Sequence, residues 1–273
     1  MSRSSRERAS QWGALFIWVW LFAAAPALAR ECPADHVDER AVVSEVVDGD
    51  TLRLTDGRLV RFIGINTPEL GRDDKPTEPL AVDARQALLG LLPPGAAVGL
   101  RYGSERLDRY HRTLAHVYTA AGVSVEAKLL AAGLAAHIVV PPNAWQWQCY
   151  RETEAEARSA GKGVWTSIYR PLPVADLARD TKGFRIVTGR IERIGESKRS
   201  LWFNFPRRPG EGSREGVALR IDLDDLGNFE SWNPRDLQGR EVVARGWFYP
   251  YKGQAVLRVR HPAAVEIVTD KDR

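Results

Sequence analysis

Two short motifs and one arginine between them decide the fold: Asp48-Gly49-Asp50-Thr51, Arg61, and Asn66-Thr67-Pro68-Glu69. A β-branched run, residues 41–47, leads into the first motif, whose Asp-Gly pair is a turn signal between strands. Residues 58–65 then form a run that is largely apolar on both faces, as in a strand inside a closed barrel or under helices. Arg61 lies within that run, where a guanidinium is costly unless an anion meets it.

The residues that follow show helical and strand periodicity in turn. The pattern predicts helices over residues 79–92, 125–132 and 145–160. It predicts strands over residues 98–102 and 113–118, between the first and second of these helices. Ser124 is the expected N-cap of the second helix. Strands, a helix, more strands and two closing helices together indicate an α+β barrel of the oligonucleotide-binding type.

The N-terminus has the layout of a secretory signal peptide. Residues 1–29 contain a basic start, an apolar run over 13–25, and Ala27-Leu28-Ala29 as a small-x-small cleavage site. An uncleaved membrane anchor is the alternative, but the run is short for a spanning helix and ends at Pro26. Cleavage after Ala29 predicts a periplasmic or secreted protein with no stable membrane association.

The mature chain contains two cysteines, Cys32 and Cys149. Two cysteines in an exported protein usually pair, so we expect a disulfide between them. A bridge closing a loop of about a hundred residues is worth up to about 4–5 kcal/mol on the chain-entropy model.

The charge is unevenly distributed. The whole chain has a formal net charge of +4, but residues 30–171 carry 17 basic and 19 acidic side chains. Residues 172–273 carry 19 basic and 15 acidic side chains. Any electrostatic preference for a polyanion therefore lies toward the C-terminal part.

The C-terminal part begins after a predicted linker, residues 170–182, which is rich in Pro and polar residues. Residues 183–273 alternate in a β pattern with five or six expected strands, which favours a second, mainly β, oligonucleotide-binding-like domain. Its aromatic residues lie near arginines and lysines: Trp202, Trp247, Phe248, Tyr249 and Tyr251. Such a mixture suits stacking on single-stranded bases, but alternation predicts that many of these rings fill the core. A protein contact or a purely stabilising role is equally open.

A third motif, Asp108-Arg109-Tyr110-His111-Arg112, completes a recognisable set. Together with the first two motifs and the closing pattern from Glu154 to Trp165, it resembles the staphylococcal (micrococcal) nuclease family. The similarity covers about residues 40–165. It implies a five-stranded barrel with three helices, which we place in a domain spanning residues 30–169.

The resemblance also implies roles for individual residues. Asp50 matches a calcium-binding aspartate, and Thr67 matches a residue whose backbone carbonyl binds the metal. Arg61 and Arg112 match the arginines that contact the phosphate under attack. Glu69 matches the carboxylate usually given the general-base role. Asp108 and Tyr110 match flanking positions that shape the substrate-binding site.

Asn66 departs from the family pattern, in which an aspartate supplies a second charged calcium ligand. An amide oxygen is still an acceptable calcium ligand, so we expect weaker calcium binding rather than none. His111, where the family commonly has glycine, is a smaller departure for which a surface role is expected. The histidines show no spacing that suggests a metal site.

The resulting prediction is an exported, calcium-dependent nuclease, a monomer that cleaves DNA and RNA with little sequence preference. Each site residue also has a simpler interpretation. Arg61 could be a structural arginine paired with Asp50 or Glu69, and Arg112 could form an ordinary ion pair with Asp108. The alternatives for the whole protein are a catalytically weakened or inactive module that binds nucleic acid or a protein, and an envelope protein whose C-terminal domain recruits a partner.

Overall fold

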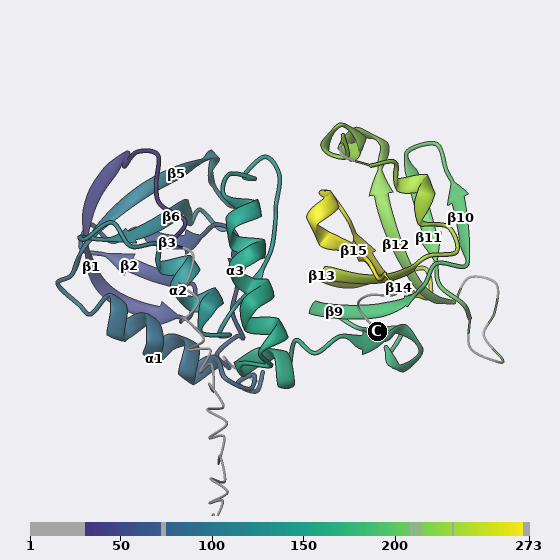
Figure 1. The fold of residues 1–273 in the computed structure, drawn as a ribbon, viewed down its shortest axis with the longest axis horizontal. Helices are drawn as coiled ribbons and strands as arrows, with labels where there is room; N and C mark the ends of the chain where they lie inside the picture. The colour runs from purple at the N-terminus through teal and green to yellow at the C-terminus, as the bar shows by residue number, and fades with distance from the viewer. Residues whose placement is uncertain are drawn as a thin grey trace, which may run out of the picture.

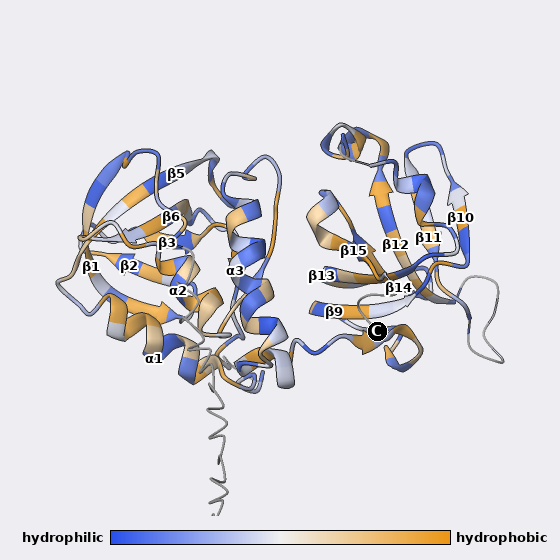
Figure 2. Ribbon diagram, viewed as in Figure 1, coloured by the Kyte–Doolittle hydropathy of each residue, from blue (hydrophilic) through white to orange (hydrophobic). Residues whose placement is uncertain are grey.

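The structure is a computed structural model that describes residues 31–71, 75–207, 210, 212, 215–230 and 232–269. The predicted signal peptide lies outside the described residues. Two lobes are joined by one chain crossing (Figure 1). In both lobes, apolar residues alternate with polar ones along the strands (Figure 2).

The first lobe is built on a closed barrel with the strand order β1-β2-β3-β6-β5. Its strands are β1 (Glu39–Asp48), β2 (Thr51–Leu54), β3 (Leu59–Phe62), β5 (Ala97–Leu107) and β6 (Thr113–Thr119). Buried residues such as Leu52, Val60 and Val117 fill its interior. The closed five-stranded barrel confirms the fold predicted for this part of the chain.

Three α-helices cover this barrel in the described part of the lobe: α1 (Ala81–Leu91), α2 (Val125–Ala131) and α3 (Trp147–Ser159). The predicted cap of the second helix is present, because the Ser124 side chain accepts a hydrogen bond from the Ala127 N–H. A short antiparallel pair, β4 (Ile65–Asn66) and β7 (Ala136–His137), places the second motif beside α3. The 3₁₀ helix η1 (Gly163–Thr166) follows α3.

The two cysteines form a disulfide, with a Cα–Cα distance of 5.8 Å between Cys32 and Cys149. The bridge ties the segment before β1 to α3. The predicted pairing is therefore present in the structure.

The second lobe is mainly β, as expected. Its strands are β8 (Leu172–Pro173), β9 (Gly183–Arg190), β10 (Arg193–Glu196), β11 (Ser200–Asn204), β12 (Gly216–Asp222), β13 (Glu241–Tyr251), β14 (Gln254–Arg258) and β15 (Val265–Ile267). They form one sheet in the order β10-β11-β12-β14-β13-β9-β8, with β15 beside β13. The described strands therefore pair into one open sheet and not into a closed barrel. The oligonucleotide-binding-like topology of this lobe stays a prediction.

Short 3₁₀ helices connect these strands: η2 (Val174–Asp176), η3 (Leu223–Asn228), η4 (Pro234–Leu237) and η5 (Pro262–Ala264). β8 and η2 fall inside residues 170–182, the segment predicted as a linker. β8 pairs in parallel with β9, so this segment is attached to the second lobe.

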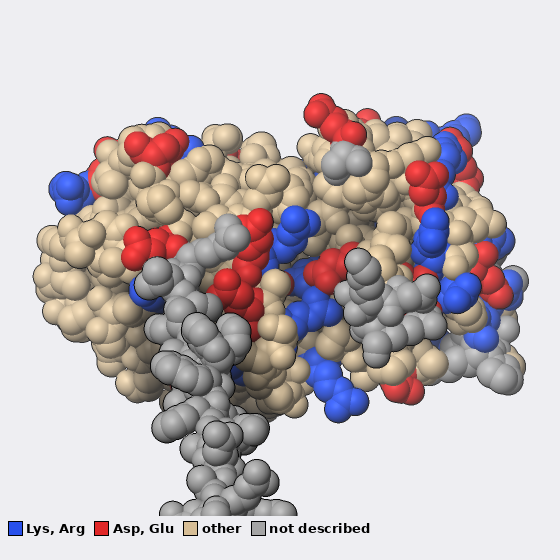
Figure 3. Space-filling view, viewed as in Figure 1, with Lys and Arg blue, Asp and Glu red and all other residues tan. Residues whose placement is uncertain are grey.

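The junction between the lobes has its own buried cluster, which includes Trp165 and Tyr169 from the first lobe and Phe184 and Val243 from the second. Arg245 of β13 reaches into the first lobe and bonds both carboxylate oxygens of Glu154 at 2.8 and 2.6 Å. Acidic and basic side chains mix along this junction on the molecular surface (Figure 3). Packing and a buried ion pair therefore hold the lobes together.

No helix in the described part of the chain has the length and apolar character needed to cross a membrane.

Candidate active site

The first motif forms the turn between β1 and β2, and it directs Asp50 toward the second motif. The Asp50 carboxylate accepts hydrogen bonds from the Thr67 N–H at 2.9 Å and from the Thr51 hydroxyl at 3.2 Å. Glycine is required beside it, because a Cβ at Gly49 would lie 2.7 Å from the Ala84 Cβ. The turn, α1 and the second motif are thus in close contact, which brings the two motifs together.

Arg61 lies on β3 and is only 9% exposed. Its Nη1 donates to the carbonyl oxygens of Phe62 at 2.6 Å and Ile65 at 3.0 Å. Its Nη2 lies 3.1 Å from the Asp50 carboxylate and donates to the Asn66 side-chain oxygen at 3.4 Å. Asp50 is therefore the anion that the sequence analysis required beside this buried guanidinium. Because this ion pair is present, Arg61 can have a structural role as well as the predicted role in phosphate binding.

Asn66 has a partner that the sequence did not reveal. Its Nδ2 donates to the Tyr169 hydroxyl at 2.9 Å and to the Thr67 carbonyl oxygen at 3.3 Å. An aspartate at this position could make neither of these donations. The amide therefore belongs to a local network that also fixes the end of the first lobe.

Glu69 is held by the loop that follows it. Its N–H donates to the Glu78 carboxylate at 2.9 Å, and its carbonyl oxygen accepts from the Glu78 N–H at 2.9 Å. Burial raises the pKa of Glu69, with a further contribution from the Asp50 charge, while the charges of Arg61 and Arg112 oppose the rise. A carboxyl with a raised pKa is a better proton acceptor when ionised, which suits a general base.

The third motif forms a tight turn organised by Asp108. One carboxylate oxygen accepts the N–H groups of Tyr110 and Arg112 at 2.9 Å each, and the other accepts the Arg112 Nε at 2.7 Å. Within the described residues, no side chain or backbone acceptor is bonded to the two Nη groups of Arg112. His111 has φ +60°, a left-handed conformation that explains why glycine suits this position. The Tyr110 ring is exposed.

Asp48 is a site residue that sequence reasoning treated only as part of a turn. Its carboxylate accepts the Asp50 N–H at 3.2 Å. Burial raises the pKa of Asp48 to about 7, and the charges of Asp50 and Glu69 add to the rise. The signal that could have identified it is the two aspartates spaced i, i+2 around one glycine.

The structure therefore brings the predicted residues of all three motifs into one electrostatic neighbourhood. Asp50, Asn66 and Thr67 are linked by hydrogen bonds through Arg61 and the Thr67 backbone. Glu69 is close enough to Asp50, Arg61 and Arg112 for their charges to shift its pKa. The catalytic and metal-binding roles of these side chains stay predictions.

The oxygen donors at this site suit a hard cation. They are the Asp50 carboxylate, the Asn66 amide oxygen and the Thr67 carbonyl, with the Asp48 carboxyl nearby. Burial is the main cause of the raised pKa of Asp48, and repulsion from Asp50 adds to it; a bound cation would oppose both effects by favouring the ionised carboxylate. No cluster of three or more His, Cys, Asp or Glu side chains with metal-site spacing occurs among the residues that the structure describes.

Comparison with known proteins identifies the family. The model of the family described as "Staphylococcal nuclease homologue" matches residues 59–167. The chain is 31% identical over 139 residues to a thermonuclease of Staphylococcus intermedius, covering 50% of this chain and 82% of the relative. It is 31% identical over 128 residues to a thermonuclease of Staphylococcus hyicus, covering 46% of this chain and 75% of the relative. The chain belongs to the staphylococcal nuclease family.

A longer match is to endonuclease YhcR of Bacillus subtilis, 29% identical over 210 residues and covering 73% of this chain. The chain spans only 17% of that relative's length, and 43% of the SPbeta prophage-derived endonuclease YokF of the same organism.

Proposed function

We propose that this protein is a calcium-dependent nuclease that hydrolyses phosphodiester bonds in DNA and RNA with little sequence preference. The observation that carries the proposal is the convergence of Asp50, Arg61, Glu69 and Arg112 on one neighbourhood from three separate motifs. The similarity to thermonucleases and endonucleases supports it. By the same resemblance, the products would be 3′-phosphates and 5′-hydroxyls.

The side chains can divide the work of hydrolysis among them. Arg112 presents two Nη groups while Asp108 holds its Nε, so it can donate paired hydrogen bonds to phosphate oxygens. Arg61 adds positive charge where the transition state gains negative charge. Glu69 in its ionised form can take the proton of the attacking water.

Calcium would be held by Asp50, Asn66 and the Thr67 carbonyl. When bound, it would neutralise phosphate charge and orient water. Because Asn66 supplies no charge, we expect weaker binding than an aspartate would give.

We also propose export to the periplasm or beyond the cell. The basic and apolar pattern of residues 1–29 supports this, and so does the Cys32–Cys149 disulfide, because such bridges persist in oxidising compartments. A monomer is proposed for the mature protein.

A second candidate is a nuclease-fold module with weak or no activity. One observation favours it: the Asn66 side-chain oxygen already accepts a hydrogen bond from Arg61, while the Asn66 nitrogen donates to Tyr169. Such a module would bind nucleic acid without cutting it.

A zymogram with purified protein separates these possibilities. We expect clearing of DNA and RNA gels in millimolar calcium and loss of clearing in EDTA. Equal clearing with and without EDTA would contradict metal dependence. Binding of nucleic acid with no clearing under any condition would select the inactive module.

Asn66→Asp tests the metal assignment. The new carboxylate adds a charged calcium ligand, so the calcium concentration for half-maximal cleavage should fall. Titration of initial rates with calcium measures this. An unchanged calcium requirement would remove Asn66 from the proposed ligands.

A further inference from the structure

The outer face of the second sheet carries aromatic rings that do not fill the core. Alternation along β11 directs Leu201 and Phe203 inward and leaves Trp202 half-buried on the other face. On β13, Phe248 is buried, whereas Tyr251 is 37% exposed. The expectation that many of these rings fill the core therefore holds for Phe248 alone among the five aromatic residues singled out in this lobe.

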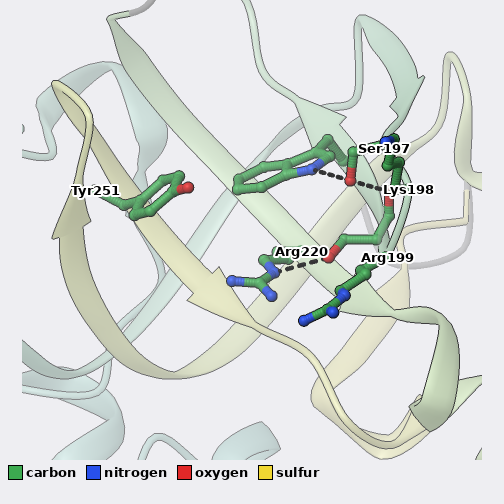
Figure 4. Close-up of a pocket in the computed structure, with 7 residues that line it drawn as sticks. Ser197, Lys198, Arg199, Arg220 and Tyr251 are labelled. Carbon is green, nitrogen blue, oxygen red and sulfur yellow. Dashed lines mark hydrogen bonds between the residues drawn. The ribbon is translucent and has the colours of Figure 1, made fainter.

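Trp202 and Tyr251 lie together, although they come from different strands. Their ring centroids are 5.8 Å apart with an angle of 20° between the planes. They border an open hollow of about 360 Å³, whose other edge is formed by the turn between β10 and β11 (Figure 4). The Trp202 indole N–H donates to the Ser197 hydroxyl at 3.4 Å, which fixes the ring at the edge of the hollow.

Positive charge surrounds these rings. Lys198 and Arg199 are exposed on the turn that lines the hollow. Arg220 lies beneath, with its guanidinium carbon 5.6 Å from the Trp202 ring centroid. The Lys252 ammonium lies 5.3 Å from the Tyr251 ring centroid.

Arg220 is fixed in place by neighbours. It bonds Asp222 at 2.6 Å and the Ser200 hydroxyl at 3.0 Å. Asp222 is also paired with Arg258 at 2.9 Å, so the charge of this acid is neutralised by two arginines. Lys198 and Arg199 are exposed cations that line the same hollow as the two rings.

We propose that this hollow binds single-stranded nucleic acid. Bases would stack on the faces of Trp202 and Tyr251, and Lys198 and Arg199 would contact the backbone phosphates. Every base has a π-face, so such a site tolerates any sequence. The proposal adds a second binding site to the proposed nuclease and does not require the first site to cleave.

The hollow is separate from the catalytic neighbourhood. β10 and β11, whose connecting turn lines the hollow, lie toward the side of the second lobe that is farther from the barrel (Figure 1). A nucleic-acid strand bound at the hollow would be retained by the protein while another part of the same nucleic acid reaches the first lobe. Short oligonucleotides would bind one site only.

The test uses the full-length protein in EDTA, which stops metal-dependent cleavage. A fluorescein-labelled oligothymidylate of about 20 nucleotides, longer than the roughly 4–16 nucleotides of a single small β site, is titrated with protein and followed by anisotropy. Trp202→Ala and Tyr251→Ser should each weaken binding about tenfold. Trp202→Phe keeps a stacking ring and should retain most of the affinity.

Trp247→Ala is the matched control. Trp247 is 44% exposed on β13 and packs against Phe184, outside the hollow. Its replacement should leave binding unchanged. Wild-type binding by the folded Trp202→Ala and Tyr251→Ser variants would overturn the proposal, and so would an equal loss with Trp247→Ala. Circular dichroism checks folding.

The phosphate contacts have their own readout. The double variant Lys198→Ala/Arg199→Ala should make the slope of log affinity against log salt about 1.4 less steep, at roughly 0.7 for each lost phosphate contact with a single strand. An unchanged slope would contradict the assignment of these two cations. Heparin, a polyanion without bases, provides the last comparison: an equal loss of heparin binding in Trp202→Ala would rule out stacking. If the zymogram showed no cleavage, the proposed nuclease activity would be contradicted, but these binding results would still decide whether the hollow binds nucleic acid.

Discussion

Replacing Arg245 by methionine would test how the two lobes are joined. Arg245 and Glu154 are each 2% exposed at their side chains, with the closest N···O distance at 2.6 Å. Arg245 also bonds Glu266 at 2.5 Å, and Glu154 accepts the His137 N–H at 2.7 Å. Methionine fills a similar volume but leaves the Glu154 carboxylate buried without its counter-ion.

The size of the effect follows from the chemistry of that carboxyl. Removing one partner of a buried pair costs about 3–5 kcal/mol. Glu154 can escape part of this by taking up a proton, at about 1.4 kcal/mol for each pH unit above its ordinary pKa near 4.3. This limits the loss at pH 7 to about 3–4 kcal/mol, and at pH 5 to about 1 kcal/mol. Loss of Arg245 raises the folded-state pKa of Glu154 further, so the stability deficit must grow as the pH rises.

Urea unfolding at pH 5 and pH 7, followed by tryptophan fluorescence and circular dichroism, measures the difference between variant and wild type. Arg235→Met is the control, because Arg235 and Glu196 form an exposed pair at 3.0 Å. It should cost less than about 1 kcal/mol at both pH values. The double variant Arg245→Met/Glu154→Met should recover most of the lost stability. A loss below about 1 kcal/mol at pH 7, or one that does not shrink at pH 5, would refute this reasoning.

Three further outcomes follow from single features of the first lobe. Gly49→Ala places a Cβ against Ala84, so cleavage should fall at least about tenfold while the free energy of unfolding falls by about 1–3 kcal/mol, both measurable on one preparation. Burial raises the pKa of Glu126 to about 8, so the stability that its neutral acid provides is complete below about pH 4.3 and lost as pH rises through 8. Glu126→Gln should weaken the pH dependence of the free energy of unfolding measured with urea. The same pH dependence in the variant and the wild type would contradict this assignment. Reducing the Cys32–Cys149 bridge, whose ends are 117 residues apart, should lower the unfolding free energy by about 4–5 kcal/mol, and a negligible change on reduction would contradict the assigned bridge role.

Local chemistry made much of the first lobe predictable. The Asp-Gly turn, the Ser124 cap and the two-faced apolar strand each depend on neighbours a few residues away, so their signals are complete within short windows of sequence. The buried Arg61 also required an anion on physical grounds, and Asp50 supplies it.

The features that were missed depend on long-range contacts. Tyr169 lies 103 residues from Asn66, and Arg245 lies 91 residues from Glu154. Nothing in the local pattern of either segment specifies such a partner, because the pairing is set by how the lobes pack. The same reason explains the Trp202–Tyr251 pair, since alternation gives the face of each ring but not which rings meet.

The central claim is that the three motifs form one phosphodiesterase site. Its most direct test is the initial rate of single-stranded DNA cleavage in calcium by Arg112→Ala, compared with Arg109→Ala. Arg112 is partly exposed and its partner Asp108 can be solvated, so the folded state should survive its loss. We expect Arg112→Ala to slow cleavage about 10²–10³-fold and Arg109→Ala, an exposed neighbour in the same turn, to leave the rate within about twofold. A wild-type rate for Arg112→Ala would contradict the account.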